Sequence, residues 1–264
     1  MNFIQTIILA IIEGITEFLP ISSTAHLRFA NPFLGVQPSP FVDMFEVVIQ
    51  LAAILSIVVL YWKKFFDYNR TAFYLKLIIA TIPALIVGFI LKKDVDAALN
   101  NLMFIACVMI GGGIILLFID NIIKNNFIDD EKQISISKSF VIGCFQTLSI
   151  LLPGISRSAV TIIGGMQQKL TRRLAAEFSF FLAVPTMIAA SGYSFWSLYK
   201  EHPEVISKDS MTILAIGGIV SFIVALIAVK FFISYLQKHG FKVFGWYRII
   251  VGIAMLALIV THRI

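Results

Sequence analysis

The stretch EGITEFLPISSTAHL, residues 13–27, interrupts an apolar region that extends over Phe3–Leu34. Pro20 lies at the interruption, and hydroxyl and imidazole side chains follow it. A second apolar region, Ser139–Gln168, is interrupted in the same way by LPGISRSAVTIIGG, residues 152–165. Irregular backbone inside a membrane persists only where protein or a water-filled cavity satisfies its amide groups. The two breaks therefore predict re-entrant pairs of half-helices around an internal polar chamber.

The rest of the chain has the composition of a membrane protein. Hydrophobic residues make up 59% of the 264 residues and charged residues only 14%, with a mean hydropathy of +0.92, whereas soluble domains carry about 25% charged residues. A helix needs about 20 residues to cross the hydrocarbon core. We predict an all-α polytopic membrane protein with about six transmembrane helices and two re-entrant helix pairs. The predicted spans are Met44–Trp62, Leu75–Leu91, Leu102–Ile119, Ala176–Tyr199, Met211–Phe232 and Phe244–Thr261.

The two breaks also suggest an internal repeat. A proline, a Glu or Gln seven residues before it and a serine three residues after it recur at an offset of 133 residues. Broken segments at corresponding positions of two halves are typical of inverted-repeat membrane folds, whose polar site lies between the repeats. We predict a single membrane domain, 1–264, with inverted repeats of approximately 1–125 and 126–264. The matching residues are Glu13, Pro20 and Ser23 in the first half and Gln146, Pro153 and Ser156 in the second.

The basic residues indicate orientation rather than nucleic-acid binding. They are scattered between apolar stretches, without the basic stripe of a nucleic-acid interface. If the loop after Trp62 is cytoplasmic, fourteen of the 21 Lys and Arg, Arg248 among them, fall inside, six, including Arg263, fall outside, and Arg157 lies within the membrane. The positive-inside rule favours this orientation. Both termini would then be extracytoplasmic.

Glu13 and Glu17 are the first candidates for chemistry. Their i, i+4 spacing places both carboxylates on one helix face, where repulsion is unfavourable unless a cation or a shared proton relieves it. Oxygen ligands of this kind suit Mg²⁺ or Ca²⁺. The alternative is that one or both acids are solvated at the headgroup level, although acids inside membranes are functional by default.

Hydroxyl groups and an imidazole follow Pro20. A hydroxyl becomes a good nucleophile when a base takes its proton, and His26 could be that base for Ser23. His26 could instead attack phosphorus itself. Alternatively, the hydroxyls of Ser22, Ser23 and Thr24 only cap a half-helix.

Arg157, between Ser156 and Ser158, is the candidate anion ligand of the second break. Its planar guanidinium suits bidentate contact with phosphate. Gly154 lets the backbone approach a ligand, and the N-terminus of the following half-helix presents amide donors. The alternative is an Arg that reaches to the membrane interface. The predicted substrate-binding residues are Ser22, Thr24, Gly154, Ser156, Arg157 and Ser158.

Together the breaks supply acids for a hard cation, a nucleophile and a guanidinium, the groups that phosphoryl transfer requires. Other polar residues carry less weight. Glu177 is expected to pair with Arg172 or Arg173 at the membrane edge. Glu46 and Gln50 either line the same chamber or mark the outer end of their span. The two cysteines, Cys107 and Cys144, have no metal-ligand spacing and are expected to be packing residues.

In these motifs the chain resembles the undecaprenyl-diphosphate phosphatase family of bacteria, and the resemblance covers essentially its whole length. RRLAAEFSFFLAVP, residues 172–185, is similar to a third stretch of that family, while Ala159 stands where the family more often has Gly. The resemblance implies hydrolysis of the C55 polyprenyl diphosphate, which regenerates the lipid carrier of peptidoglycan precursors and confers bacitracin resistance. It implies that Glu13 and Glu17 bind the divalent metal or position water. Ser23 or His26 would attack phosphorus, and Arg157 would clamp the diphosphate.

The resemblance further implies a bacterial cell membrane location, a site that opens to the extracytoplasmic side, and a possible homodimer among membrane lipids. The polyprenyl tail is soluble in the membrane and its diphosphate is not, so the substrate requires a lateral entrance to a polar pocket. A transporter or lipid flippase is the alternative, because many carriers are built on inverted repeats. A carrier has no use for a nucleophile at Ser23. A non-catalytic scaffold would tolerate neutral substitutions at Glu17 and Arg157.

Overall fold

The computed structural model describes residues 1–124, 126–205 and 207–261. Within these ranges, six helices are long and apolar enough to cross a membrane and no β-strand is present. Each predicted span coincides with one of these helices, so the predicted all-α polytopic membrane fold is confirmed. The six helices are α3 (Pro40–Leu60), α5 (Thr71–Ile90), α7 (Leu102–Ile122), α10 (Arg172–Glu201), α11 (Lys208–His239) and α12 (Lys242–Val260).

Several of these helices begin earlier than the apolar pattern predicts, because polar caps start them. Ser39 accepts a hydrogen bond from the amide of Val42 at the start of α3, and Pro40 follows as the first helical residue. Thr171 caps α10 and Ser207 caps α11 in the same way. A capping side chain satisfies an amide that has no partner within the helix. The helices therefore extend beyond the membrane-depth residues that the hydropathy identifies.

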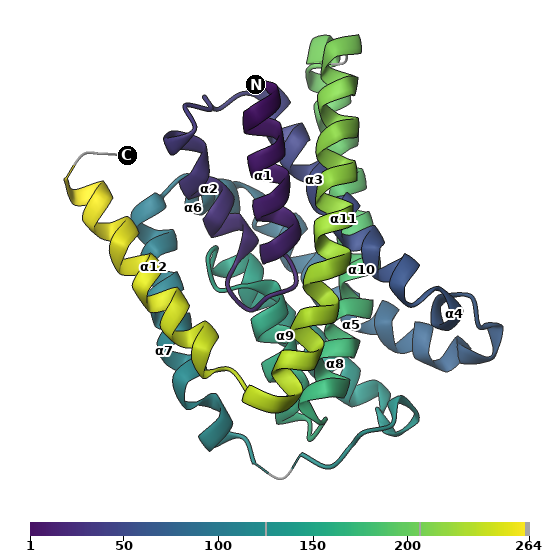
Figure 1. The fold of residues 1–264 in the computed structure, drawn as a ribbon. Coiled ribbons are helices and arrows are strands. Elements are labelled where there is room, and N and C mark those ends of the chain that lie inside the picture. The colour runs from purple at the N-terminus through teal and green to yellow at the C-terminus, as the bar shows by residue number, and fades with distance from the viewer. Residues whose placement is uncertain (125, 206, 262–264) are drawn as a thin grey trace.

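The two interrupted regions form pairs of short helices, as predicted. In each pair the first helix contacts the second. All four helices are shorter than the roughly 20 residues that a span requires. Figure 1 shows the first pair in the upper part of the molecule and the second pair lower in the centre. Their entry and return through one face of the membrane stays a prediction. The pairs are α1 (Phe3–Thr16) with α2 (Ser23–Phe33), and α8 (Ile136–Leu151) with α9 (Arg157–Gln167).

Helices of the two sequence halves are interleaved. The most extensive contacts join α7 to α12, α3 to α11, α1 to α11 and α5 to α8, and Figure 1 shows α12 running along α7. Small residues allow the close approach: a Cβ on Gly143 of α8 would overlap the backbone of Ala80 on α5. Close packing at small residues is the usual way in which membrane helices associate. The division into repeats 1–125 and 126–264 stays a prediction.

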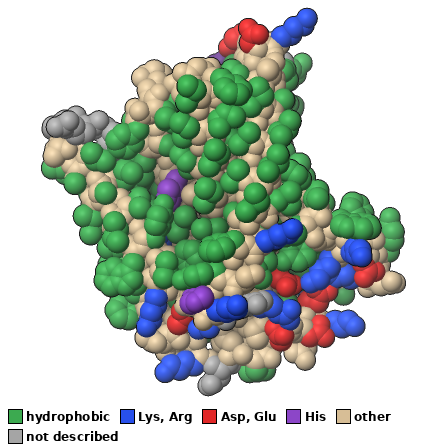
Figure 2. All heavy atoms as spheres, in the orientation of Figure 1, with side chains coloured by type: hydrophobic (Ala, Val, Ile, Leu, Met, Phe, Trp, Pro, Cys, Tyr) green, Lys and Arg blue, Asp and Glu red, His purple; other side chains and the backbone are tan. Residues whose placement is uncertain are grey.

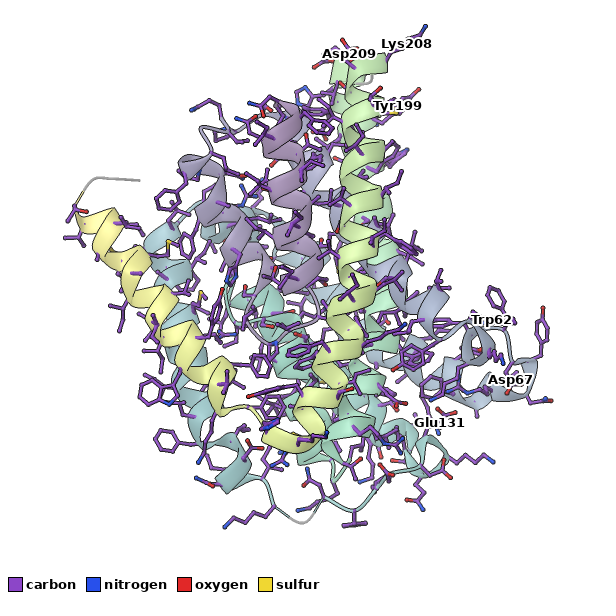
Figure 3. All side chains as sticks on the ribbon, in the orientation of Figure 1. Trp62, Asp67, Glu131, Tyr199, Lys208 and Asp209 are labelled. Atoms are coloured by element: carbon purple, nitrogen blue, oxygen red, sulfur yellow. The ribbon has the colours of Figure 1, made fainter. Side chains whose placement is uncertain are left out.

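The outer surface matches a lipid environment. Figure 2 shows hydrophobic side chains over most of the visible face, with charged side chains gathered mainly at its lower end. Glu131 lies at that end, and Lys208 and Asp209 lie at the opposite end (Figure 3). Cys107 and Cys144 are exposed, so the expectation that they are packing residues was wrong. The connections include the short helices α4 (Trp62–Phe65) and α6 (Lys92–Leu99).

Candidate active site

A cavity of about 610 Å³ lies between the two breaks. Its polar lining comes mainly from both breaks, with further polar side chains from α3, α6, α8 and α10, and its apolar lining comes largely from α5, α6 and α10. The cavity thus has a polar part, as the interrupted helices predicted, and a long apolar wall. The polar lining residues include Glu17, Ser22, Ser23, Thr24, Gln50, Ser156 and Arg157, and the apolar ones Leu85, Phe89, Val95, Leu99, Met187 and Ala190.

Ser23 and Glu17 form a hydrogen-bonded pair within the first break. Glu17 is the residue at which α1 ends, and Ser23 is the first residue of α2. The hydroxyl of Ser23 donates to Glu17 Oε2 at 2.7 Å, and the side-chain amide of Gln50 donates to the same oxygen at 3.5 Å. A carboxylate that accepts from a serine hydroxyl is placed to take its proton. The pair therefore has the geometry of a nucleophile and its base.

Arg157 joins the second break to the first. Its Nη2 donates to Glu17 Oε1 at 3.1 Å, and its Nη1 donates to the carbonyl of Ser179 at 3.3 Å. Both partners of the ion pair are largely buried. The Nε of Arg157 is buried and has no hydrogen-bond partner among the described residues. Breaking a buried pair is costly because one charge is left uncompensated, so Glu17 and Arg157 fix each other's position at the cavity.

The two breaks share an unusual backbone conformation. Ser22 has φ 72° and Ser156 has φ 78°, values that non-glycine residues adopt rarely. Each serine caps the helix that follows, and its hydroxyl accepts from the amide of Ala25 or Ala159 at 3.3 Å. The capping alternative is therefore confirmed for Ser22, and Ser156 caps its helix in the same way. Ser22, not Ser23, corresponds to Ser156, because Ser22 is two residues after Pro20 whereas Ser156 is three residues after Pro153.

Up to the two prolines, equivalent residues are 133 positions apart, as predicted. After the prolines they are 134 positions apart, so Ser23 corresponds to Arg157 and not to Ser156. Ser23 and Arg157 are the first residues of their helices, α2 and α9. The first amides of a helix have no acceptor within it, and they favour bound anions. Because Ser23, Thr24 and Arg157 all line the cavity, two helix N-termini reach the same space.

Ser158, predicted to bind substrate, has another role in the structure. Its side chain is buried and its hydroxyl donates to the carbonyl of Leu19 in the first break at 2.9 Å. The described residues that line the cavity include Ser22, Thr24, Gly154 and Ser156 but not Ser158. Ser158 thus links the two breaks rather than facing the cavity.

His26 lies away from the cavity. Its Nδ1 is 2.7 Å from the carbonyl oxygen of Ser22, and its Nε2 is 2.8 Å from the hydroxyl of Tyr247, whose ring stacks on it. A carbonyl only accepts, so Nδ1 carries the proton and Nε2 accepts from Tyr247. His26 is absent from the cavity lining as far as the described chain defines it. Its part in attack on phosphorus stays a prediction, and the structure does not bring it to Ser23.

Glu13 is the candidate cation ligand deepest in the protein. Its side chain is 0% exposed, and neither carboxylate oxygen has a hydrogen-bond partner in the described part of the chain. A buried carboxylate without a partner requires a proton or a cation. Within the described part of the chain, no group of three or more His, Cys, Asp or Glu side chains is placed to hold a metal. Mg²⁺ is commonly held by one or two carboxylates together with waters and substrate phosphates, so Glu13 and Glu17 fit such an ion.

Arg248 is the main polar residue that the sequence reasoning misplaced. Arg248 was predicted to be one of the cytoplasmic charges, but it lies in α12 with 0% of its surface exposed. It donates to the carbonyls of Ile155 at 2.7 Å, Gly154 at 2.9 Å and Pro20 at 3.2 Å. A single Arg inside the apolar stretch Phe244–Thr261 was the available signal, since buried charges in spans are usually functional.

Other polar side chains have different partners from those expected. Glu177 pairs with Lys64 at 3.0 Å, and Arg172 and Arg173 instead bind Asp120 and Asp129. The expected pairing of Glu177 was therefore wrong, because α4 brings Lys64 closer. Glu46 accepts from Asn31 and pairs with Arg28. Of the two residues on α3, only Gln50 lines the cavity in the described structure.

The fold and the site define a class: a polytopic membrane protein with an internal site that joins a serine, carboxylates and a guanidinium across two broken helix pairs. The family comparison is specific. The chain belongs to the family described as bacitracin resistance protein BacA, whose model matches residues 6–254.

Several relatives are similar over nearly their whole length. The chain is 50% identical over 258 residues to an undecaprenyl-diphosphatase of Flavobacterium psychrophilum. The aligned residues make up 98% of this chain and 96% of that relative. It is 47% identical over 277 residues to an undecaprenyl-diphosphatase of Porphyromonas gingivalis, covering 99% and 98%. An undecaprenyl-diphosphatase of Aquifex aeolicus is 44% identical over 256 residues, covering 96% and 97%. The resemblance to this family is thereby confirmed.

Proposed function

We propose that this protein is an integral membrane phosphatase that hydrolyses undecaprenyl diphosphate to undecaprenyl phosphate and inorganic phosphate. One observation carries the proposal: Glu17 accepts from Ser23 through one oxygen and from Arg157 through the other, at the edge of the cavity. The relatives described above are named undecaprenyl-diphosphatase. The activity recycles the lipid carrier of cell-wall precursors, which explains bacitracin resistance.

The reaction would proceed in two displacements. Ser23 Oγ attacks the terminal phosphorus while Glu17 takes the hydroxyl proton, and the bond between the bridging oxygen and the terminal phosphorus breaks. Undecaprenyl phosphate leaves and a phosphoserine remains. Water then attacks the phosphoserine, which releases inorganic phosphate and restores the Ser23 hydroxyl. Splitting one difficult step into two easier ones is the advantage of a covalent route.

Stabilisation of charge is the main task in phosphoryl transfer. Arg157 can turn one guanidinium edge to the substrate, because its buried Nε has no partner in the described chain. The free amides at the starts of α2 and α9 would bind phosphate oxygens. A divalent cation, Mg²⁺ or Ca²⁺, held by Glu13 and Glu17 would neutralise diphosphate charge when bound.

The apolar wall supports a polyprenyl substrate. Leu85 and Phe89 on α5, and Met187 and Ala190 on α10, extend the cavity beyond its polar part. A diphosphate group held by the breaks would leave the polyprenyl chain against this wall. Because the tail already lies in hydrocarbon before it binds, the wall gives it an apolar path to the site rather than a large gain in free energy. A homodimer stays a prediction.

We also propose that the protein lies in the bacterial cell membrane with its site open to the extracytoplasmic side. Removing Arg248 from the fourteen cytoplasmic charges leaves thirteen against six in the printed sequence, so the positive-inside argument still holds. Arg263 lies outside the described residues. Lys92, Val95 and Leu99 of α6 line the cavity, and α6 connects α5 to α7 at the end predicted to be extracytoplasmic.

The proposal is tested by phosphate release from C55 diphosphate with detergent-purified protein, with and without chelator. Wild-type protein should release phosphate in the presence of Mg²⁺ or Ca²⁺ and lose this activity with chelator. Arg157→Ala and Glu17→Gln should each lower kcat/KM by at least about 100-fold. If the wild type releases no phosphate with any cation, the enzyme is excluded and the transporter alternative gains support.

A further inference from the structure

Arg248 is a buried cation whose partners are backbone carbonyls. It lies in the WYRII segment of α12, and no carboxylate pairs with it among the described residues. Its three guanidinium nitrogens donate to four carbonyl oxygens. The acceptors are Ile155 at 2.7 Å, Gly154 at 2.9 Å, Pro20 at 3.2 Å and Met109 at 3.2 Å. Burying such a charge inside a membrane protein is expensive, so the contacts it makes need an explanation.

The acceptors show what the side chain does. The carbonyl of Pro20 belongs to the first break, and those of Gly154 and Ile155 belong to the second. Carbonyls in a broken helix have lost their intrahelical donors, and no water in hydrocarbon replaces them. Because the guanidinium is rigid and carries five donors, one side chain can satisfy both breaks and fix the distance between them.

The same two breaks carry the reacting groups. Glu17 belongs to the first break and Arg157 to the second, and their ion pair joins residues 140 positions apart in the sequence. Ser158 adds a second link between the breaks through the carbonyl of Leu19. The serines at both breaks, Ser22 and Ser156, have positive φ values, which persist only where the surroundings enforce them.

We infer that Arg248 is a positioning residue for phosphoryl transfer: it joins the two breaks so that Ser23, Glu17 and Arg157 meet. This inference rests on the proposed function. Arg248 does not touch the reacting atoms, since it is absent from the described cavity lining. Its loss should therefore change the rate of the chemical step more than the binding of substrate.

Substitution of Arg248 tests the inference through kcat and KM. Arg248→Met fills similar space without donors and should lower kcat by about 100-fold, the effect of a displacement of about 1 Å in an active site. KM should change by no more than about threefold, because uniform substrate binding is kept. Arg248→Lys, which keeps a donor and the charge, should recover part of the lost kcat. A purely structural role would not give this graded recovery at constant KM.

A second variant leaves Arg248 in place. Gly112 on α7 faces the guanidinium, and a Cβ added there would overlap Arg248 Nη2. Gly112→Ala should therefore displace the side chain and lower kcat without removing a charge. Gly111→Ala is the matched control on the same helix, because its Cβ would meet nothing within 4 Å. If Arg248→Met does not fold, as judged by size-exclusion chromatography, the comparison of kcat between Gly112→Ala and Gly111→Ala tests the inference instead.

The outcomes separate the inference from the proposed function. Active wild type with loss of kcat in Arg248→Met and Gly112→Ala, and normal kcat in Gly111→Ala, supports the positioning role. Active wild type with unchanged kcat in Gly112→Ala and Arg248→Met overturns it and leaves the phosphatase intact. A rise in KM at constant kcat also overturns it, since Arg248 would then act on substrate binding. A wild type without phosphate release contradicts the proposed function itself, and the positioning role falls with it.

Discussion

Ser23 and Glu17 are joined by a 2.7 Å hydrogen bond that closes the first break from one helix to the next. The other carboxylate oxygen of Glu17 accepts from Arg157, which comes from the second half of the chain. Glu17 is therefore shared by the candidate nucleophile and the candidate phosphate ligand. A change at this carboxylate therefore affects both Ser23 and Arg157. Substitutions of Ser23 and of Arg157 themselves are needed to separate the role of the nucleophile from that of the phosphate ligand.

Replacement of Ser23 by alanine should abolish hydrolysis. Ser23→Ala should lower kcat by at least about 10³-fold, since it removes the attacking oxygen. Ser149→Ala is the matched control, because Ser149 lines the same cavity while its hydroxyl donates to the carbonyl of Gln146. Phosphate release measures both variants. A larger loss in His26→Ala than in Ser23→Ala would instead assign the attack to His26.

Removal of the Glu13 charge should weaken the binding of the divalent cation. Glu13→Gln should raise the Mg²⁺ concentration for half-maximal activity by at least about tenfold, because one of the two proposed carboxylate ligands is lost. Glu46→Gln is the control, since Glu46 is a largely buried carboxylate with its own partners, Asn31 and Arg28. A cation titration of phosphate release gives the answer. An unchanged midpoint in Glu13→Gln would show that Glu13 does not hold the ion.

Cysteine labelling should establish the orientation. Lys208 is the first residue of α11 and Lys132 lies in the connection before α8, and both side chains are exposed. In a chain with Cys107 and Cys144 replaced by serine, a membrane-impermeant maleimide added to intact cells should label Lys208→Cys and spare Lys132→Cys. Permeabilised cells, in which both positions should react, provide the control. The reverse pattern would place the site on the cytoplasmic side.

Close contact between α5 and α8 should make Gly143 sensitive to any side chain. A Cβ at Gly143 would overlap the backbone of Ala80, which cannot move as a side-chain end can. Gly143→Ala should therefore lower the free energy of unfolding by about 1–3 kcal/mol, seen as a lower Tm in detergent. Gly192→Ala on α10 should not lower it, because its Cβ would meet nothing within 4 Å. Equal Tm values for the two variants would contradict the close contact.

Asp129, in the connection between α7 and α8, should stabilise the protein only above acidic pH. Hydrogen bonds from Thr171 and then Arg173 lower the pKa of Asp129 below its ordinary value. A lowered folded-state pKa contributes stability above the unfolded-state pKa, and this stability is lost as pH falls through the folded value. Because the side chain is half exposed, the contribution should not exceed about 1 kcal/mol. Asp129→Asn should lower Tm at pH 7, and the difference should shrink below about pH 4; a difference that grows there would contradict the assignment.

Much of the fold could be predicted because hydropathy reports directly on burial in lipid. The six spans were found, and Pro20 and Pro153 marked the breaks. Ser23, Glu17 and Arg157 could be grouped because polar side chains inside apolar segments face the protein interior or a cavity and pair with one another there. The one-residue difference between the breaks could not be predicted, since it depends on the positive φ values of Ser22 and Ser156.

The contacts between side chains that are distant in sequence could not be predicted from sequence patterns. Arg248 looked like one more basic residue near a helix end, and only the packing of α12 on α7 shows that it meets both breaks. Glu177 was expected to pair with a neighbour in sequence, yet Lys64 is nearer in space. His26 looked like a base for Ser23, but the carbonyl of Ser22 and the hydroxyl of Tyr247 hold it elsewhere.

The interleaving of the two halves sets the order in which a newly synthesised molecule can be completed. The early helices α3 and α7 obtain their main partners, α11 and α12, only when almost the whole chain has left the ribosome. Until then their apolar faces must remain against lipid or the insertion machinery. Since Arg248 arrives with the last helix, the link that it makes between the two breaks forms at the final stage of biogenesis. A chain terminated before α12 would retain Ser23, Glu17 and Arg157 but would lack the Arg248 contacts that join the two breaks.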